Sequence, residues 1–523
     1  MPASQKIITK LRERRQIEAS LRAMVAASSE LELRQRAQEI ASLGSQVIPT
    51  LIGNLDHADA SLLKAMGVVA AHLDREKVIM AMRRAVIQPQ RTDRGRMGAI
   101  TILERFLGQT PDDDLLGSLS DPEGVAISSL EETLDQAEDS PATMIQYIEG
   151  LDQQEPHIVL AVMRSLQTSE GAPDPFGPPQ RAIEPLRMMA QDVREEIAAE
   201  AIRTLGSIQL PEAAHALQTL LPIVWPSVQP LAERLLRKLQ FRGVEVPTLP
   251  PPDPGWRALI SPLNGLGQQS VWFIQRNDGT DQARFLNILL SDRAGAVEAM
   301  GHTRVPVQML PPKRPPGHLH DIALPDGSGS MLMLEAAFDV GRRLVLDALA
   351  HNLRTQIPVA GPLRLLSPWL WGVAGGDSLP HRELPDLAQE DGALLSASAQ
   401  LLEHPAFVTW TARSEATFQA AEEVLLHPSW DLELWVRRLA GELLGEPAMA
   451  QVLSKRLAAM SEWLLLAGDD RRAKLALVAS RTMLAEVPQD HPFLQAVVRR
   501  DLESTVHSLK RSLRLDNENN PIP

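Results

Sequence analysis

Cysteine is absent from the 523 residues of this chain. Disulfide bonds, iron–sulfur clusters, thiol catalysis and zinc sites with cysteine ligands are therefore excluded. The absence fits a reducing compartment, and we expect a cytoplasmic protein. Near the aromatic cluster, the longest uncharged and largely apolar run, Leu365–Gly376, has 12 residues and contains Pro368. A membrane-spanning helix needs about 20 apolar residues, so no membrane span is expected.

Positive charge is missing from one part of the chain. No Lys or Arg occurs between Phe106 and Met163, a stretch that holds 13 acidic residues. This acidic stretch accounts for nearly all of the net charge of −14. It is either a solvated face or a docking surface for a basic partner, and charge runs more often have the first role. A protein that binds nucleic acid is usually basic where it contacts phosphate, so the charge argues against nucleic acid as a partner.

Known catalytic signatures are missing as well. The sequence has no GxxxxGK(S/T) loop, no HExxH, no EF-hand loop and no GxSxG, each of which would supply the geometry that its chemistry needs. The nearest glycine-rich element, Asn264–Gly267, precedes a strand-like run rather than a helix. It therefore favours a hairpin turn over a phosphate-binding loop. We expect no catalytic residue and no cofactor on this basis.

An internal repeat is present. When the chain is aligned with itself at an offset of 162 residues, several identical residues coincide, among them Ala37 with Ala199, Leu43 with Leu205, Gly44 with Gly206 and Pro49 with Pro211. The offset corresponds to four periods of about 40 residues, a length typical of stacked helical hairpins.

The residues of the second copy predict such a hairpin. Apolar residues recur every four positions in Asp192–Ser207, which predicts a helix with one buried face. Gly206 is expected to end this helix in the left-handed conformation. The preceding segment, Arg181–Gln191, is expected to form the partner helix, with Pro185 near its start, where a missing N–H costs little. One hairpin cannot bury both of its faces, so it must stack on others.

This order of an apolar helix with proline, an Asp-Val-Arg turn and an Ala-rich helix ending in Leu-Gly resembles the HEAT repeat of armadillo-type proteins. The same order occurs in Val47–Leu73, and the resemblance covers roughly residues 30–242. It implies an α-solenoid that binds other proteins over an extended concave surface. Arg194 and Arg203, which lie between the buried positions, are the expected surface contacts.

Beyond the repeats, a small α+β module is expected before a C-terminal helical bundle. Prolines in Val246–Gly255 predict a semi-rigid spacer. Short apolar runs at Trp256–Ile260, Ser270–Gln275 and Arg284–Leu290 predict an antiparallel meander. The predicted fold class is mainly α, with the α+β module inserted between helical regions. The expected division is a HEAT-like solenoid over 1–245, a linker over 246–255, the α+β module over 256–360, an irregular connector over 361–392, C-terminal helices over 393–515 and a disordered tail over 516–523.

Helices are predicted inside the module and after it. Ser291 and Asp292 are expected to cap a helix over Ala294–Met300 that Gly301 ends. Met331–Arg354 also has a helical pattern. In the C-terminal part, the spacing of apolar residues predicts separate amphipathic helices over Leu432–Leu444, Ala448–Leu466, Asp470–Leu484 and Phe493–Leu513.

Three histidines are weak candidate metal ligands. His318 and His320 flank one residue and would face the same way in an extended strand, with Asp321 beside them. His302 is the nearby residue that could complete a site. Two histidines alone are nonspecific, and a solvated loop is the favoured alternative.

Trp369 and Trp371 are candidate contacts with a partner, because large aromatic residues dominate binding hot spots. The favoured alternative is that they pack the α+β module against the C-terminal bundle, since buried aromatic residues are commoner than exposed pairs.

These features together favour a non-catalytic scaffold or adaptor that binds one or more proteins. An enzyme with a ligand pocket in the α+β module is the first alternative, and it would need the three histidines and Asp321 to converge. A HEAT-like protein that binds nucleic acid is the second alternative. It would need Arg and Lys from distant segments to meet on one concave stripe.

Overall fold

A computed structural model describes residues 3–25, 30–58, 60–109, 121–137, 140–167, 178–276, 279–323, 329–374, 392–412, 414–427, 432–443, 447–484 and 488–519. The chain folds into two compact units, unit 1 (Met1–Pro185) and unit 2 (Leu186–Pro523). The boundary between them lies inside the range that the sequence assigns to one solenoid, 1–245.

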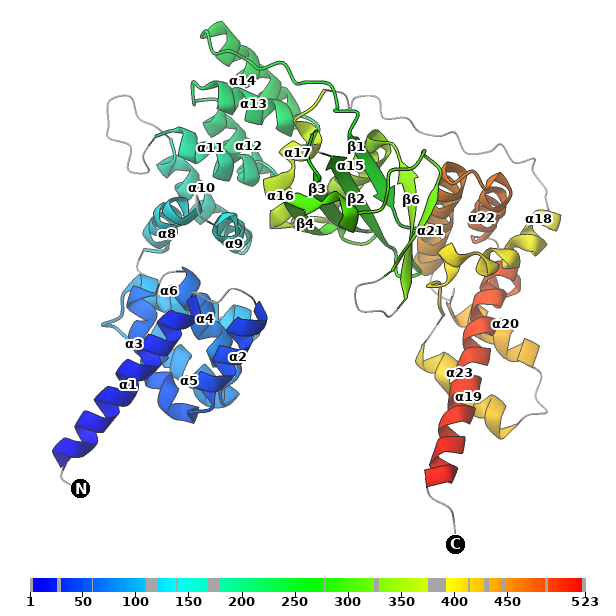
Figure 1. Ribbon diagram of the computed structural model, residues 1–523, viewed down its shortest axis with the longest axis horizontal. Coiled ribbons are helices and arrows are strands. Elements are labelled where there is room, and N and C mark those ends of the chain that lie inside the picture. The colour runs from blue at the N-terminus through cyan, green and yellow to red at the C-terminus, as the bar shows by residue number, and fades with distance from the viewer. Residues whose placement is uncertain are drawn as a thin grey trace. The chain divides into compact units, whose positions relative to one another are not determined.

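Unit 1 consists of helices, drawn from blue to cyan in Figure 1. Local sequence explains where several begin. Thr92 caps α6 by accepting a hydrogen bond from Gly95 N at 3.2 Å. Pro141 and Pro156 start α9 and α10, where the missing N–H would have no helical partner. The helices are α1 (Ala3–Val25), α2 (Glu30–Ala41), α3 (Ile48–Asn54), α4 (Ala60–Ala71), α5 (Arg75–Val86), α6 (Asp93–Thr101), α8 (Pro122–Ala137), α9 (Pro141–Leu151) and α10 (Pro156–Ser165).

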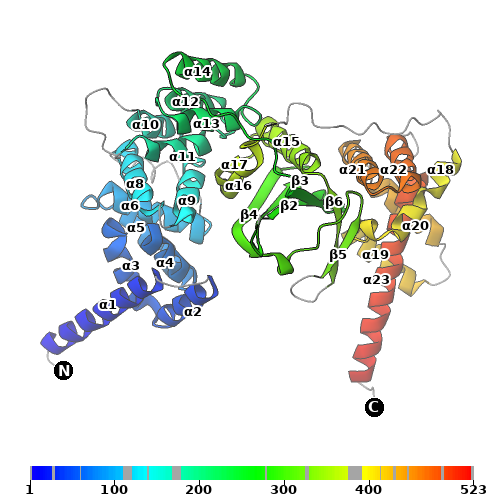
Figure 2. The same ribbon diagram turned by 45° about the horizontal axis from the view of Figure 1, so that its top comes forward.

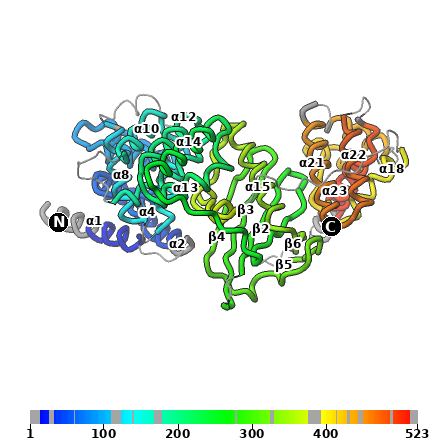
Figure 3. The backbone as a smooth tube through the Cα atoms, turned by 90° about the horizontal axis from the view of Figure 1, so that it is seen from above, coloured from blue at the N-terminus to red at the C-terminus, as the bar shows by residue number. Residues whose placement is uncertain are grey.

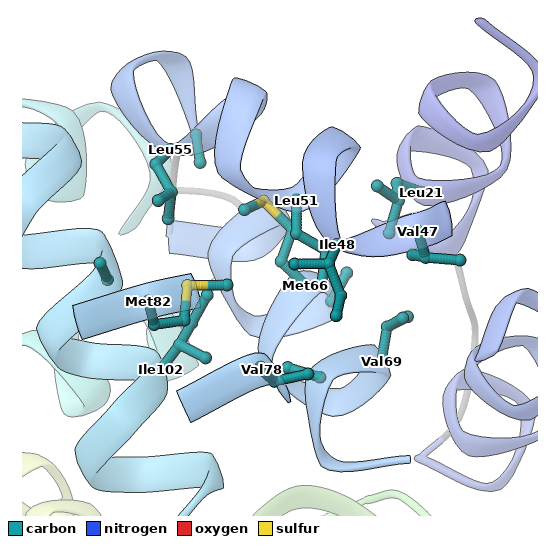
Figure 4. Packing of buried hydrophobic residues seen from close by; sticks show 14 of the residues in the cluster. Leu21, Val47, Ile48, Leu51, Leu55, Met66, Val69, Val78, Met82 and Ile102 are labelled. Carbon is teal, nitrogen blue, oxygen red and sulfur yellow. The ribbon is translucent and has the colours of Figure 1, made fainter. Parts of the chain in front are cut away.

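One apolar cluster joins α1 to α6. Leu21 of α1, Leu51 of α3, Met66 of α4 and Met82 of α5 belong to it and are almost completely buried (Figure 4). Burying such a side chain stabilises a fold by about 1.5–3 kcal/mol. The two helices predicted within Val47–Leu73 are confirmed as α3 and α4.

Two helical hairpins follow, and α11 crosses the boundary between the units. α11 (Gln180–Met189) is followed by α12 (Glu195–Leu205), and α13 (Pro211–Leu220) packs on α12 and on α14 (Gln229–Phe241). The buried stripe predicted for α12 is confirmed, because Ile197, Ala201 and Leu205 are fully buried.

Two details of these hairpins were predicted wrongly. Pro185 lies inside α11 rather than near its start, so one N–H is missing from the hydrogen-bond ladder of the helix. Gly206 has φ −69°, which is not left-handed. A Cβ there would lie 2.8 Å from the Leu235 side chain of α14. Glycine at this position therefore permits close packing of α12 on α14.

An antiparallel sheet forms the centre of unit 2, with the strand order β4-β3-β2-β1-β6-β5. α15 (Phe338–Thr355) lies along one face of it (Figure 2). There Phe338 packs on Trp256 and Phe273, with ring centroids 5.1 and 5.6 Å apart. The three strands predicted from apolar runs are confirmed as β1, β2 and β3. The strands are β1 (Trp256–Ile260), β2 (Gln268–Arg276), β3 (Gln282–Ser291), β4 (Gly295–Pro306), β5 (Leu319–Ala323) and β6 (Ser330–Ala336).

The helix predicted over Ala294–Met300 is wrong, because these residues turn into β4. Ser291 Oγ accepts the backbone N–H two residues later at 3.2 Å, so the residue that suggested a helix cap serves a turn. Gly295 follows with φ +73°. Asn352 of α15 then fixes the new strand, since its Oδ1 accepts from Ala296 N at 2.7 Å. A positive-φ glycine after a short loop is typical of hairpins.

The helix predicted over Met331–Arg354 is partly wrong. Its first residues form β6, and the helix α15 begins only at Phe338. Met333 and Leu334 are neighbours on opposite faces of the strand, and both are fully buried. A strand that is covered on both faces lacks the alternation that distinguishes it from a helix.

Short helices also occupy part of the range predicted as an irregular connector, 361–392. They are α16 (Gly361–Leu366) and α17 (Pro368–Trp371). Residues 375–391 of that range lie outside the described residues.

The C-terminal helices agree with their predicted boundaries to within a few residues at most ends. Figure 3 draws these helices in yellow, orange and red. They contact the sheet and its loops through α21: Trp463 Nε1 donates to Ile260 O at 3.1 Å, and Arg456 Nη2 donates to Leu266 O at 3.0 Å. The last helix runs through Asn519, into the range 516–523 that was predicted as a tail, and residues 520–523 lie outside the description. The helices are α18 (Gly392–Ala397), α19 (Glu415–Leu426), α20 (Leu432–Leu443), α21 (Pro447–Leu466), α22 (Asp470–Thr482) and α23 (Pro492–Asn519).

The prediction of a mainly helical chain with a small antiparallel sheet is confirmed. Of the helices in the ranges given above, none is both long enough and apolar enough to cross a membrane.

Candidate functional site

A buried charge network joins three strands of the sheet. Glu335 Oε2 accepts a hydrogen bond from Arg257 Nη1 at 2.7 Å and lies 2.7 Å from His320 Nε2. The side chains of Glu335, Arg257 and His320 are 2%, 8% and 7% exposed. Arg257 also donates to the carbonyls of Pro311 and Pro312. A buried carboxylate needs such partners, because leaving it unpaired costs several kcal/mol.

Strand alternation places these side chains on one face. Ala258 and Phe273 face Gly341 of α15, so Arg257 points to the opposite face of the sheet. Glu335 lies across from Leu259 on β6, and His320 follows on β5. Burial lowers the pKa of Arg257, and the Glu335 carboxylate offsets part of that effect. Because each group has its partner within the network, the arrangement joins strands rather than presenting a reactive group.

His318 and His320 lie together, and His302 does not join them. The two imidazole centroids are 4.9 Å apart, edge to face. His302 is on β4, paired with Phe285, and four strands separate β4 from β5 in the sheet order. Asp321 is exposed. In the ranges that the structure covers, no group of three or more His, Asp or Glu residues could hold a metal ion.

The two tryptophans of α17 differ in exposure. Trp371 is 1% exposed, with the Arg342 guanidinium 4.7 Å from its ring centroid. Trp369 is half-buried, with the Arg284 guanidinium 5.8 Å from its ring. α17 also packs on α13. These contacts favour packing over partner binding for Trp371, and the elements it joins are α13 and α15.

The two arginines predicted as surface contacts have different environments. Arg194 donates from Nε and Nη2 to Asp192 at 3.0 and 2.7 Å, and its side chain is 18% exposed. This pair holds the turn between α11 and α12. Arg203 pairs with Glu200 at 2.8 Å but remains 55% exposed, so it can reach a partner.

The acidic stretch is partly neutralised by arginines that flank it in the sequence. Arg94 donates to both carboxylate oxygens of Glu132, at 2.6 and 2.9 Å, and Arg181 donates to Asp135 at 2.7 Å. These pairs are partly exposed and contribute little stability each. Five residues of the stretch lie outside the described ranges: Asp112, Asp113, Asp114, Glu138 and Asp139.

Side-chain bonds between successive hairpins of unit 1 recur at a similar sequence separation. Asp56, in the turn after α3, accepts from Arg91 Nη1 at 2.8 Å and from Thr92 Oγ1 at 2.7 Å before α6. Arg94 donates to the carbonyl of Ala58 and to Glu132 of α8. These bonds join residues 35 to 38 apart. We call this series the hairpin ladder.

Sequence reasoning missed a row of exposed basic residues on α14. The row has the spacing i, i+3, i+4, i+7, i+8, so its members share one face of the helix. All are exposed, and Phe241 is 91% exposed. The opposite face, with Ala232 and Leu239, is fully buried. The helical spacing of these basic residues in the sequence was the signal that could have revealed the exposed row. We call this face the basic stripe: Arg234, Arg237, Lys238, Phe241 and Arg242.

No family model matches this chain, and no significant match was found among curated proteins or solved structures. The resemblance to HEAT repeats therefore stays a prediction from the residues.

Proposed function

We propose that this protein is a non-catalytic scaffold or adaptor that binds one or more proteins through stacked, HEAT-like helical hairpins. The observation that carries the proposal is the hairpin ladder, whose bonds join residues about one repeat apart. Repeats that contact chiefly their neighbours present long surfaces on which partners dock. We also propose a cytoplasmic location, because a chain without cysteine suits a reducing compartment.

The hairpins α11–α14 offer the candidate binding surface. Arg203 reaches solvent from α12, and the basic stripe adds four cations and one aromatic ring on α14. Arginine and aromatic side chains are enriched in protein interfaces and in their hot spots. These residues support protein binding more directly than any residue of the sheet does.

An enzyme with a pocket in the sheet has less support. The four residues that it would need do not converge, because His302 lies on the far edge strand from His320. His320 is also held by the buried carboxylate of Glu335. A reactive group needs access to substrate, and this imidazole is 7% exposed.

The proposal is tested by capture from extract of the cells that make the protein. The full chain, with a photo-crosslinking benzoylphenylalanine in place of Arg203, is irradiated in extract at low and high salt, with nucleic acid digested in a parallel sample. A matched chain carries the crosslinker in place of Lys474, an exposed residue of α22. We expect defined protein adducts from position 203 that survive digestion, and few from position 474.

Either of two results would contradict the scaffold function. One is recovery of nucleic acid alone, with protein adducts lost on digestion. The other is equal, diffuse crosslinking from both positions, which would show that the hairpins hold no specific partner.

A further inference from the structure

We propose that the basic stripe is a docking surface for an acidic peptide segment that carries an apolar side chain beside its carboxylates. The inference rests on the proposed function, because it names the chemistry of a partner for the same hairpins.

The cations of the stripe lack acidic partners. Over the ranges that the structure describes, no ion pair involves Arg234, Arg237, Lys238 or Arg242, although Glu233 lies one turn before Arg237. Some exposed arginines elsewhere in the chain are paired, as Arg203 is with Glu200. Four neighbouring cations on one helix face repel one another and attract an anion. These four cations lie together on α14 although the chain as a whole has a net charge of −14.

Phe241 adds an apolar contact at one end of these charges. The ring is 91% exposed, while the face of α14 that packs on α12 and α13 is filled by residues such as Leu239. A partner that covers the ring gains the free energy of removing apolar surface from water. The surface therefore fits a ligand that combines negative charge with an apolar group.

The dimensions of the stripe favour a peptide. From Arg234 to Arg242 the stripe covers eight steps of about 1.5 Å, or about 12 Å, which matches two turns of a facing helix with carboxylates at i, i+4 spacing. Three of the four cations are arginines, whose planar guanidinium groups bind carboxylates in a bidentate manner. Acidic motifs are a common ligand of arginine clusters.

Other anionic partners fit less well. A membrane surface requires a broad apolar face to enter the headgroup region, and α14 offers a single exposed ring because its apolar face is buried. Nucleic acid carries dense charge along its whole length, and a chain with a net charge of −14 repels it beyond the short stripe.

Fluorescence anisotropy of a labelled short peptide rich in Glu and Leu tests the proposal on the full chain. Its Gln-for-Glu counterpart, a single-stranded oligonucleotide and phosphatidylserine vesicles serve as competing probes. The variant Arg237→Glu/Lys238→Glu is compared with Lys455→Glu/Lys474→Glu, which makes the same change of charge at exposed positions of α21 and α22. Circular dichroism and the melting temperature confirm that both variants fold.

We expect the acidic peptide to bind, its affinity to fall with salt, and the α14 variant to weaken binding at least about tenfold while the matched variant changes it less than about twofold. Phe241→Ser should also weaken binding. The proposal would be overturned if both variants lost the same affinity for the acidic peptide, or if the Gln peptide bound equally well. Tighter binding of the oligonucleotide or the vesicles that depends on the stripe would also overturn it. Protein adducts from position 203 that persist in the α14 variant would overturn the stripe as the docking surface and leave the scaffold function standing.

Discussion

At the scale of single residues, buried charges are tied to specific partners rather than left available for chemistry. Glu335 is the shared acceptor for Arg257 and His320, which come from two other strands. Removing one member of a buried ionic group costs more than the group contributes, because the remaining charge stays buried without a partner.

We therefore expect Glu335→Gln to lower the free energy of unfolding of unit 2 by about 3 kcal/mol, since Arg257 would lose its counter-charge in a buried site. Denaturant titration of the full chain, followed by tryptophan fluorescence, measures the change. Glu298→Gln is the control, because Glu298 is exposed on β4 and should change stability by less than about 0.5 kcal/mol. An equal effect of the two substitutions would contradict the assigned role of the network.

His491 gives the protein a predictable response to acid. Its Nε2 lies 3.1 Å from Ala479 O and from Thr482 Oγ1, and the ring is 5% exposed. Burial lowers the pKa of His491, so the unfolded chain takes up the proton more readily than the folded chain. Stability is then complete above the unfolded pKa of about 6.5 and is lost as the pH falls from there through the lowered folded pKa.

We expect the denaturant midpoint to fall as the pH drops below about 6.5, and to fall less steeply in His491→Gln. Midpoints of both chains measured across this range provide the test. His215 and His404 also have a pKa lowered by burial, so part of the dependence should remain in the variant. An unchanged slope would mean that His491 is not held neutral in the folded chain.

At the scale of elements, prediction from sequence succeeded where the apolar pattern fits one kind of element and failed where it fits two. The boundaries of α20 and α21 were predicted to within a residue, because their apolar residues recur at helical spacing. The sequence predicts a helix over β6 because residues on both faces of this strand are apolar. It predicts a helix at the start of β4 because Ser291 can serve a turn as well as a helix cap.

The candidate sites were harder to predict than the elements. The sequence drew attention to His320 but could not identify Glu335 and Arg257 as its companions, because strand order alone brings them together. The sequence spacing shows that the residues of the basic stripe share one helix face. Whether they can bind a partner depends on whether that face of α14 is exposed. The exposed face is determined by how α14 packs on α12 and α13, which the sequence alone does not show.

The hairpin ladder leads to a prediction at this scale. We expect Asp56→Asn to destabilise unit 1 by about 1–3 kcal/mol, because Asp56 accepts from Arg91 and Thr92 and the Arg91 side chain is only 8% exposed. Hydrogen exchange of the full chain should show faster exchange in α5 and α6. Glu76→Gln, an exposed change on α5, should leave exchange unaltered, and equal protection in both variants would rule out a stabilising ladder.

At the scale of the whole molecule, long-range bonds join segments of unit 2 that are far apart in the sequence. Arg456 of α21 donates to Asp292 and to the carbonyls of Gly265 and Leu266, which lie 164 to 191 residues earlier. Its side chain is 4% exposed. These bonds connect the C-terminal helices to the loops of the sheet.

We expect Arg456→Met to lower the unfolding free energy of unit 2 by about 3 kcal/mol and to raise hydrogen exchange in α21 and α22, because Asp292 and two carbonyls lose their donor. Arg438→Met is the control, since Arg438 is 64% exposed and pairs with Glu442 of the same helix, α20. If exchange in α21 and α22 did not change, those helices would not depend on Arg456 for their attachment.

The proline inside α11 has a mechanical consequence. Before Pro185, Arg181 is fixed to Asp135 of unit 1, and after it, Arg187 is fixed to the carbonyls of Arg364 and Leu365 in unit 2. The helix is thus clamped at both ends, and the backbone bond that Pro185 cannot donate lies between the clamps. Tension or torsion applied across the chain therefore acts on a helix that lacks one backbone hydrogen bond, and the partly exposed Arg181–Asp135 pair should give way before the buried bonds of Arg187.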